Sequence, residues 1–180
     1  MSGLKIRPAQ PADAARLEAI RSAAFAPIFS SFRSILGDEI YERAQAHENE
    51  AQDRLLASMS DPESEWKLFA AERESQVVGF VSVRLDRDWS VGEIGLNAVD
   101  PSYANEGIGT AMYEFSVSHM KRAGMKVATV ATGGDPSHAP ARPAICGKEE
   151  TSYPARNMAT GFVTIRMGPS NITRISPTAS

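Results

Sequence analysis

Residues 92–113 read GEIGLNAVDPSYANEGIGTAMY, and this stretch decides the fold. Its first half predicts a strand over Val91–Val99 that an Asp-Pro pair ends. Its second half opens with Gly107 and Gly109 and continues with apolar residues at helical spacing, which predicts a helix as far as residue 122. A glycine-rich turn between a strand and a helix directs backbone N–H groups and the helix dipole at one point, where a diphosphate can approach closely. Tight packing of helix against strand is the simpler explanation of a Gly-x-Gly pair on its own.

Outward from this stretch, the pattern of apolar residues predicts the other elements. Strands are expected at Leu4–Arg7, Trp66–Glu72, Val77–Leu85 and Met125–Thr132, and helices from Pro11 onward and across 27–60, interrupted near Gly37. The order β-α-α-β-β-β-α-β predicts an α/β (α+β) fold, with a mixed, mostly antiparallel central sheet and flanking helices. We expect one domain over residues 1–165 and a flexible tail over 166–180.

The bulk composition narrows the function classes. The 180 residues are 42% hydrophobic and 23% charged, with a net charge of −3, which fits one soluble domain and argues against a nucleic-acid binder. Cys146 is the only cysteine, and the three histidines (His47, His119 and His138) lack the spacing of metal ligands, so no metal is expected. No apolar run is long enough to cross a membrane or to form a signal peptide, so we expect a cytoplasmic protein.

The run from Glu93 to Tyr113 closely resembles the acetyl-CoA motif of the GNAT superfamily of N-acetyltransferases, and the order of elements is similar from about Leu4 to Arg142. The resemblance implies acetyl-CoA as the acyl donor. It implies that the pantetheine arm lies along the strand at Ala98 and Val99. It also assigns the diphosphate to the turn formed by Asn105, Glu106, Gly107, Ile108, Gly109 and Thr110.

Two features depart from the family pattern. Ala104 stands where the family has Arg or Gln, so one side-chain contact to the phosphates is missing. After Arg142 the family has a helix that carries a tyrosine, whereas here Pro143 and Gly147 interrupt such a helix and Ile145 takes the tyrosine position. Residues 143–165 therefore diverge from the family.

Acetyl transfer to an amine needs a base, because at neutral pH only about one alkylamine in a thousand is unprotonated. Glu93 matches the catalytic glutamate of the histone-acetylating branch of the superfamily and is the predicted base. A solvated glutamate without a role is the alternative. Asn97, two strand periods further on, is expected on the same face. Tyr153 is the predicted general acid. Tyr103 and Tyr113 are nearer the turn but can be explained by packing or exposure, and water can also protonate the thiolate.

The sequence carries fewer signals for the residues that bind the acceptor amine. The stretch 38–54 contains six acids against two arginines, which favours a cationic acceptor such as an aminoglycoside, a polyamine or a basic peptide. A solvated helix surface explains these acids equally well. The predicted acceptor-binding residues are Asn97, Asp38 and Tyr41. The predicted function is acetyl-CoA-dependent N-acetylation of a small-molecule or peptide amine, without nucleic-acid or membrane partners and with a homodimer left open. The alternative is a non-catalytic acyl-CoA-binding domain.

Overall fold

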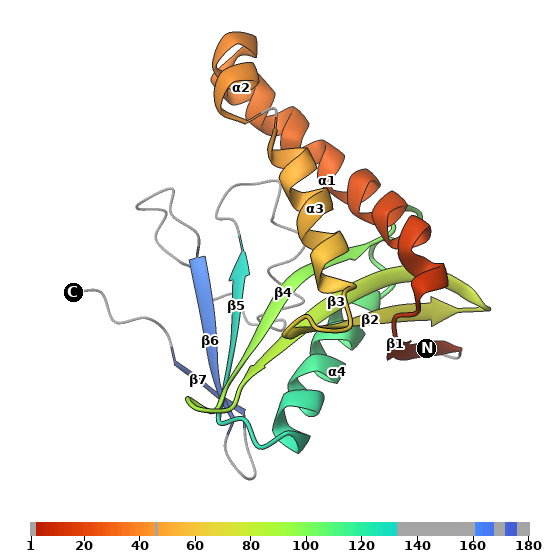
Figure 1. Cartoon of the computed structure of the whole chain (residues 1–180), viewed down its shortest axis with the longest axis vertical. Coiled ribbons are helices and arrows are strands. Elements are labelled where there is room, and N and C mark those ends of the chain that lie inside the picture. The colour runs from red at the N-terminus through yellow and green to blue at the C-terminus, as the bar shows by residue number, and fades with distance from the viewer. Residues whose placement is uncertain (1–2, 46, 133–160, 168–171, 176–180) are drawn as a thin grey trace.

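The computed structural model describes residues 3–45, 47–132, 161–167 and 172–175, and it has one central sheet with helices on both faces (Figure 1). The elements in chain order are β1 (Leu4–Pro8), η1 (Pro11–Asp13), α1 (Ala14–Leu36), α2 (Asp38–Ala44), α3 (Glu48–Met59), β2 (Trp66–Arg73), β3 (Gln76–Asp86), β4 (Val91–Val99), η2 (Pro101–Tyr103), α4 (Ile108–Arg122), β5 (Val127–Thr132), β6 (Gly161–Met167) and β7 (Ile172–Ile175). Every strand and helix expected between Leu4 and Thr132 is present.

The sheet has seven strands in the order β1-β2-β3-β4-β5-β6-β7. All neighbouring strands are antiparallel except β4 and β5, which are parallel. A parallel pair needs a long crossover connection, and α4 supplies it. The predicted mixed, mostly antiparallel sheet is confirmed.

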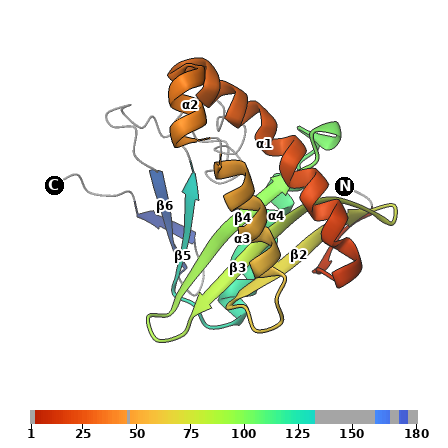
Figure 2. The same cartoon turned by 45° about the horizontal axis from the view of Figure 1, so that its top comes forward.

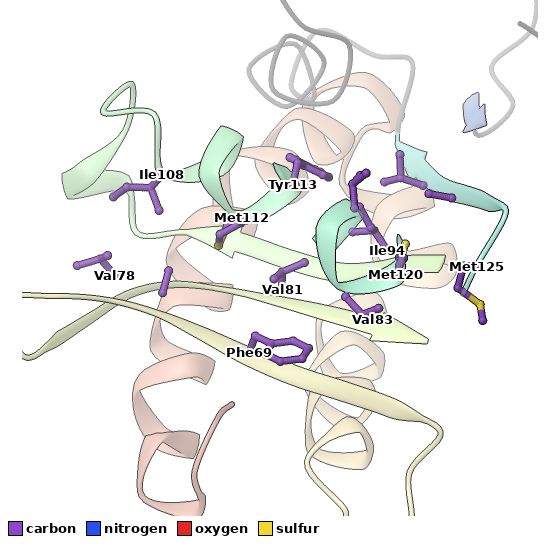
Figure 3. Packing of buried hydrophobic residues seen from close by; sticks show 14 residues of the cluster. Phe69, Val78, Val81, Val83, Ile94, Ile108, Met112, Tyr113, Met120 and Met125 are labelled. Atoms are coloured by element: carbon purple, nitrogen blue, oxygen red, sulfur yellow. The ribbon is translucent and has the colours of Figure 1, made fainter. Parts of the chain in front are cut away.

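Two apolar layers hold the helices on the sheet. On one face α4 buries Met112 and Met120 against Phe69, Val83 and other apolar residues of the sheet (Figure 3). On the other face α1 and α3 pack against the sheet (Figure 2), and their apolar side chains form a second cluster with Phe80 and Ala98. Because successive strand residues point to opposite faces, membership of these clusters shows which face each residue occupies.

Helix α1 continues through Pro27 and ends at Gly37, whose φ of 75° suits a residue without a side chain. Its buried residues, Leu17, Ile20 and Arg21, follow the i, i+3, i+4 spacing of side chains on one face of a helix, and this face packs against the sheet. The far end of α1, together with α2, projects beyond the edge of the sheet (Figure 1).

Strands β6 and β7 were not expected from the sequence. Strand β6 pairs with β5 from Thr132↔Gly161 to Val127↔Arg166, and β7 pairs with β6. Strand β6 begins at Gly161, and β7 lies inside the stretch expected as a tail. The division into a domain over 1–165 and a tail over 166–180 stays a prediction.

Candidate active site

The two parallel strands separate at their carboxyl ends. Pairing between β4 and β5 runs from Val91↔Val127 to Ile94↔Val130 and stops there, although β4 continues to Val99. Figures 1 and 2 show the two strands diverging toward these ends. In the described part of the chain, the side of β4 from residue 95 to 99 therefore has no strand partner. An extended ligand can pair with such backbone groups as an added strand would.

A β-bulge lies at the start of this split. Ile94 pairs with Val83 and Asn97 pairs with Val81, so that Ser82 faces two residues of β4. These two residues, Gly95 and Leu96, both face α1 and α3: a side chain at Gly95 would meet the Trp66 ring, and Leu96 packs in the second cluster. The Ser82 hydroxyl donates to the Leu96 carbonyl oxygen at 3.0 Å, which fixes the bulge.

The bulge places Glu93 and Asn97 on opposite faces. Glu93 lies on the face covered by α1 and α3, because its neighbour Ile94 belongs to the α4 layer. Asn97 lies on the α4 face, where its Oδ1 accepts a hydrogen bond from the Tyr113 hydroxyl of α4 at 3.1 Å. The expectation that both share one face is wrong, because the extra residue reverses the alternation between them.

Glu93 belongs to a charged cluster on its face of the sheet. Arg84, directly across on β3, donates from Nη2 to the Glu93 carboxylate at 2.6 Å, and Glu65 lies 3.8 Å from the same guanidinium. The guanidinium stacks over the Trp66 ring at 5.3 Å. The Glu93 side chain remains about one-third exposed, at 34%, so a ligand can reach this carboxylate.

The predicted phosphate turn has an anion-binding backbone. Asn105 and Gly107 are left-handed, with φ of 63° and 76°, and Gly107 precedes the first residue of α4. Among the described residues, the backbone N–H groups from 105 to 110 have no acceptor; the next donor, Ala111, bonds to the Gly107 carbonyl at 3.0 Å. Such free N–H groups at a helix start, combined with the helix dipole, attract an anion.

Two ion pairs hold this turn against the rest of the fold. Asp100, before the turn, accepts from the backbone N–H of Ser102 at 2.8 Å and pairs with Arg16 of α1. The Ser102 N–H, assisted by Arg16, lowers the pKa of the Asp100 carboxyl. Glu106, inside the turn, pairs with Arg73 at the end of β2. The Glu106 carboxylate in the turn is therefore neutralised by Arg73, a residue of β2.

The remaining predicted residues lie elsewhere. Asp38 and Tyr41 are on α2, where Arg33 of α1 pairs with Asp38 at 2.9 Å and stacks over the Tyr41 ring at 4.5 Å. Among the described residues, no hydrogen bond or ion pair connects either side chain to β4 or to the turn before α4. Their role in acceptor binding stays a prediction. Ala98 is buried toward α1, and Val99 packs against the α4 layer. Tyr153 lies outside the described residues.

The sequence did not single out Trp66, Arg73 or Arg84. The hairpin formed by β3 and β4 carries a signal for Arg84, because counting outward from its turn places Arg84 opposite Glu93. Arg73 carries no local signal, since its partner is 33 residues away.

Comparisons with known proteins identify the family of this chain. The sequence matches the acetyltransferase (GNAT) family over residues 29–143, and this chain belongs to that family. The comparison with curated proteins finds no match. Among the described residues, no helix is long and apolar enough to cross a membrane.

Solved structures show the same fold at low identity. A GNAT family acetyltransferase from Brucella melitensis in complex with acetyl-CoA is 20% identical, with a TM-score of 0.53 over 72% of this chain and 76% of that one. The PaiA N-acetyltransferase from Thermoplasma acidophilum in complex with coenzyme A is 18% identical, with a TM-score of 0.56 over 75% and 82% of the chains. An aminoglycoside 6'-N-acetyltransferase complexed with coenzyme A is 15% identical, with a TM-score of 0.51 over 72% and 62%.

Proposed function

We propose that this protein transfers the acetyl group of acetyl-CoA to a primary amine of a small molecule or peptide, by direct attack of the amine within a ternary complex. The observation that carries the proposal is the combination of a split between β4 and β5 with free N–H donors at the start of α4. The split suits an extended pantetheine arm, and the donors suit a diphosphate. Family membership supports the same donor.

The proposed cofactor residues lie in the split and in the turn before α4. The N–H groups of Asn105 to Thr110 hold the diphosphate, and the unpaired edge at Ala98 and Val99 hydrogen-bonds the pantetheine. A backbone N–H beside Asn97 faces the acetyl carbonyl and stabilises the oxyanion that forms during attack. Holding donor and acceptor together in this way itself supplies a large part of the rate enhancement.

Glu93 is the proposed base. Glu93 lies two residues before Gly95, the first residue of β4 without a partner on β5, and on the face that α1 and α3 line. The acceptor amine therefore approaches from that face and loses its proton to Glu93, directly or through one water. Because Arg84 bonds to Glu93, an incoming ammonium must compete with a guanidinium for this carboxylate.

The acceptor is proposed to be a cationic amine. The carboxylates of Glu65 and Glu93 outnumber the one guanidinium, Arg84, with which they cluster, so this side of the split carries excess negative charge. That charge, together with the acids of α2 and α3, favours a positively charged acceptor over an anionic one. An aminoglycoside, a polyamine and a basic peptide all meet this condition.

A non-catalytic acyl-CoA-binding domain is the second candidate function. Ala104, which removes one phosphate contact, favours it. The two functions differ in a simple assay. Acetyl-CoA and CoA, but not ATP, should raise the thermal midpoint in both cases, because a ligand that binds only the folded state stabilises it. Release of free CoA thiol with a panel of amines occurs only in an enzyme. No shift with CoA would rule out both functions.

The assignment of the base has its own test. Replacing Glu93→Gln keeps the size of the side chain but removes the proton acceptor, so we expect turnover to fall by about tenfold or more. Glu65→Gln is the matched control, because Glu65 also approaches Arg84 but is 81% exposed. It should leave kcat within about twofold, because a solvated charge can change the affinity for a cationic acceptor but takes no proton from it. Equal rates for the Glu93 variant and the parent enzyme at every pH would contradict the assignment.

A further inference from the structure

A row of three side chains crosses the sheet next to the split, on the face of α1 and α3. Trp66 of β2 pairs with Arg84 of β3, and Arg84 pairs with Glu93 of β4. Directly paired residues of antiparallel strands point to the same face. The apolar cluster under the helices begins two residues further along β2, at Leu68, and Arg84 keeps 42% of its side-chain surface exposed. The row therefore lies at the border of the helical layer and is open to solvent.

The guanidinium of Arg84 shows what kind of group this row holds. Its Cζ atom lies 5.3 Å from the centre of the Trp66 ring. Nη2 lies 2.6 Å from the Glu93 carboxylate, and Nη1 lies 3.8 Å from that of Glu65. An aromatic face flanked by carboxylates attracts a cation through the quadrupole of the ring and through charge. Because Arg84 is partly exposed, its ion pairs add little to stability, and the side chain can turn into water without becoming a buried unpaired charge.

The same ring touches the part of β4 where the thioester is proposed to bind. A Cβ added at Gly95 would lie 2.3 Å from Trp66 Cζ3, so the edge of the ring covers the backbone of that residue. Gly95 is the first residue of β4 beyond its pairing with β5. A cation on the face of the ring therefore lies one or two strand spacings from the split, roughly 5 to 10 Å. A diamine with a short alkyl chain spans that distance between its two nitrogen atoms.

We infer that Arg84 is a specificity-determining residue of the acceptor site, because in the free enzyme its guanidinium occupies the place that a second positive charge of the acceptor takes. The inference rests on the proposed function and narrows its cationic acceptor to one with two positive charges. The reacting nitrogen gives its proton to Glu93 and becomes neutral, so it does not remain on the ring as a cation. A second ammonium or guanidinium group keeps its charge, binds Trp66 and Glu65, and displaces Arg84 into water. Glu93 then has no guanidinium partner and is free to accept the proton.

Steady-state kinetics with putrescine and n-butylamine test this role. The two amines have the same chain length, but only putrescine carries a second charge, so we expect the parent enzyme to prefer putrescine. Arg84→Met removes the competing charge and should lower the KM for putrescine by about threefold or more, with the KM for acetyl-CoA unchanged. Trp66→Leu should raise the KM for putrescine and leave that for n-butylamine unchanged. An unchanged KM for putrescine in Arg84→Met, or a lower kcat with the same KM, overturns the inference and leaves the proposed function intact.

A second grouping of the same kind provides the comparison for these variants. Arg33 pairs with Asp38 at 2.9 Å and with Glu42, and its guanidinium lies 4.5 Å from the centre of the Tyr41 ring. Asp38 and Tyr41 are the acceptor residues predicted from the sequence, so this grouping on α1 and α2 is the rival site for the second charge. Arg33→Met should leave the KM for putrescine within about twofold. A lower KM in Arg33→Met but not in Arg84→Met overturns the inference.

A titration measures the cation site without turnover. Trp66 and Trp89 are the two tryptophans of the chain, and Trp89 is 80% exposed, so Trp89→Phe leaves Trp66 as the single fluorescent reporter. With Arg84→Ala added, methylguanidinium chloride should change the emission of Trp66 to saturation, whereas sodium chloride at the same concentration should not. The change should be weaker when Arg84 is present and when Glu65→Gln is added. Arg84→Met replaces Arg84→Ala if the latter does not fold. A response equal to that of sodium chloride overturns the inference whether or not the protein transfers acetyl groups, and CoA binding and the amine panel test the proposed function separately.

Discussion

At the scale of single residues, the turn before α4 contains an acidic side chain, Glu106, that opposes the binding of an anion there. Glu106 places a carboxylate among N–H groups that are free to bind a diphosphate, and Arg73 is the residue that neutralises it. Both side chains are partly exposed, at 41% and 37%. We therefore expect Arg73 to affect cofactor affinity by pairing with Glu106, although it lies outside the motif.

This pairing makes a prediction about charge. Arg73→Gln leaves Glu106 unpaired and should weaken CoA binding by about two- to fivefold, whereas Glu106→Gln should strengthen it by a similar factor, as expected for charges near a helix start. The double variant should bind nearly as the parent does. Calorimetric titration with CoA at low and at high salt checks this, since salt screens exposed charges.

The control for this titration is Arg43→Gln. Arg43 forms an exposed pair with Glu39 on α2 at 3.6 Å, far along the chain from the turn, and its loss should leave the affinity unchanged. Equal CoA affinity for Arg73→Gln and the parent would show that Arg73 does not act on the turn.

At the scale of elements, β4 determines the geometry of the site because its bulge sets which side chain points where. Gly95 is part of this bulge and is in close contact with Trp66: a Cβ there would lie 2.3 Å from Trp66 Cζ3 and 2.8 Å from Ser82 Oγ. No side chain fits without moving the ring on which Arg84 stacks. The absence of a side chain is therefore required by packing and not by an unusual φ.

Gly95→Ala should consequently destabilise the protein by about 1–3 kcal/mol and slow acetyl transfer, because the Trp66 ring must move and Arg84 moves with it. Urea unfolding and turnover measure the two effects. The double variant Gly95→Ala with Trp66→Phe provides the control, since the shorter ring makes room for the methyl group and should recover part of the stability. A Gly95→Ala single variant as stable and as active as the parent would contradict this description of the bulge.

At the scale of the whole molecule, one arginine connects the edge of the sheet to the helical layer. Arg7 of β1 makes two bonds to Asp13, at 2.7 and 3.0 Å, and one bond of 2.6 Å to Glu72 of β2. The Arg7 guanidinium lowers the pKa of the Asp13 carboxyl below its ordinary value. The folded state thus resists protonation at Asp13 more than the unfolded state does.

The sign of the pH dependence follows from that difference. The stabilisation is complete above the ordinary pKa of an aspartate and is lost as the pH falls below about 4 toward the folded-state value. Asp13→Asn should therefore lower the free energy of unfolding by about 1 kcal/mol or more at pH 7. The variant should also lose less stability than the parent as the pH falls. Part of the loss of stability in acid should remain in this variant, because the pKa values of Asp100 and Glu18 are also lowered in the folded state.

Thermal unfolding between pH 7 and pH 3 compares this variant with the parent and with Asp38→Asn. Asp38 also pairs with an arginine, but its side chain is 82% exposed, so its loss should change little. If Asp13→Asn lost stability in acid as steeply as the parent, Asp13 would not contribute to the pH dependence of stability.

The sequence by itself determined the parts of this protein that depend on local pattern. The Gly107-Ile108-Gly109 turn, the helix after it and the strands up to Thr132 all follow from residue spacing, because turn chemistry and periodicity act between near neighbours. Glu93 was identified from its place in the motif that surrounds this turn. Strand β6 was missed because its partner β5 lies far back in the chain and the residues between carry no clear period, and β7 was missed because its four residues are too few to show one.

Only the tertiary structure decided how these parts meet. The opposite orientation of Glu93 and Asn97 depends on a register shift between β3 and β4, and no periodicity within β4 reveals a relation between two strands. The Tyr113–Asn97 hydrogen bond requires the crossover helix to lie under the split, and Arg73 reaches Glu106 only because β2 ends beside the turn. Local sequence specifies the elements, whereas packing between distant elements specifies the site, because its contacts join residues that are far apart in the chain.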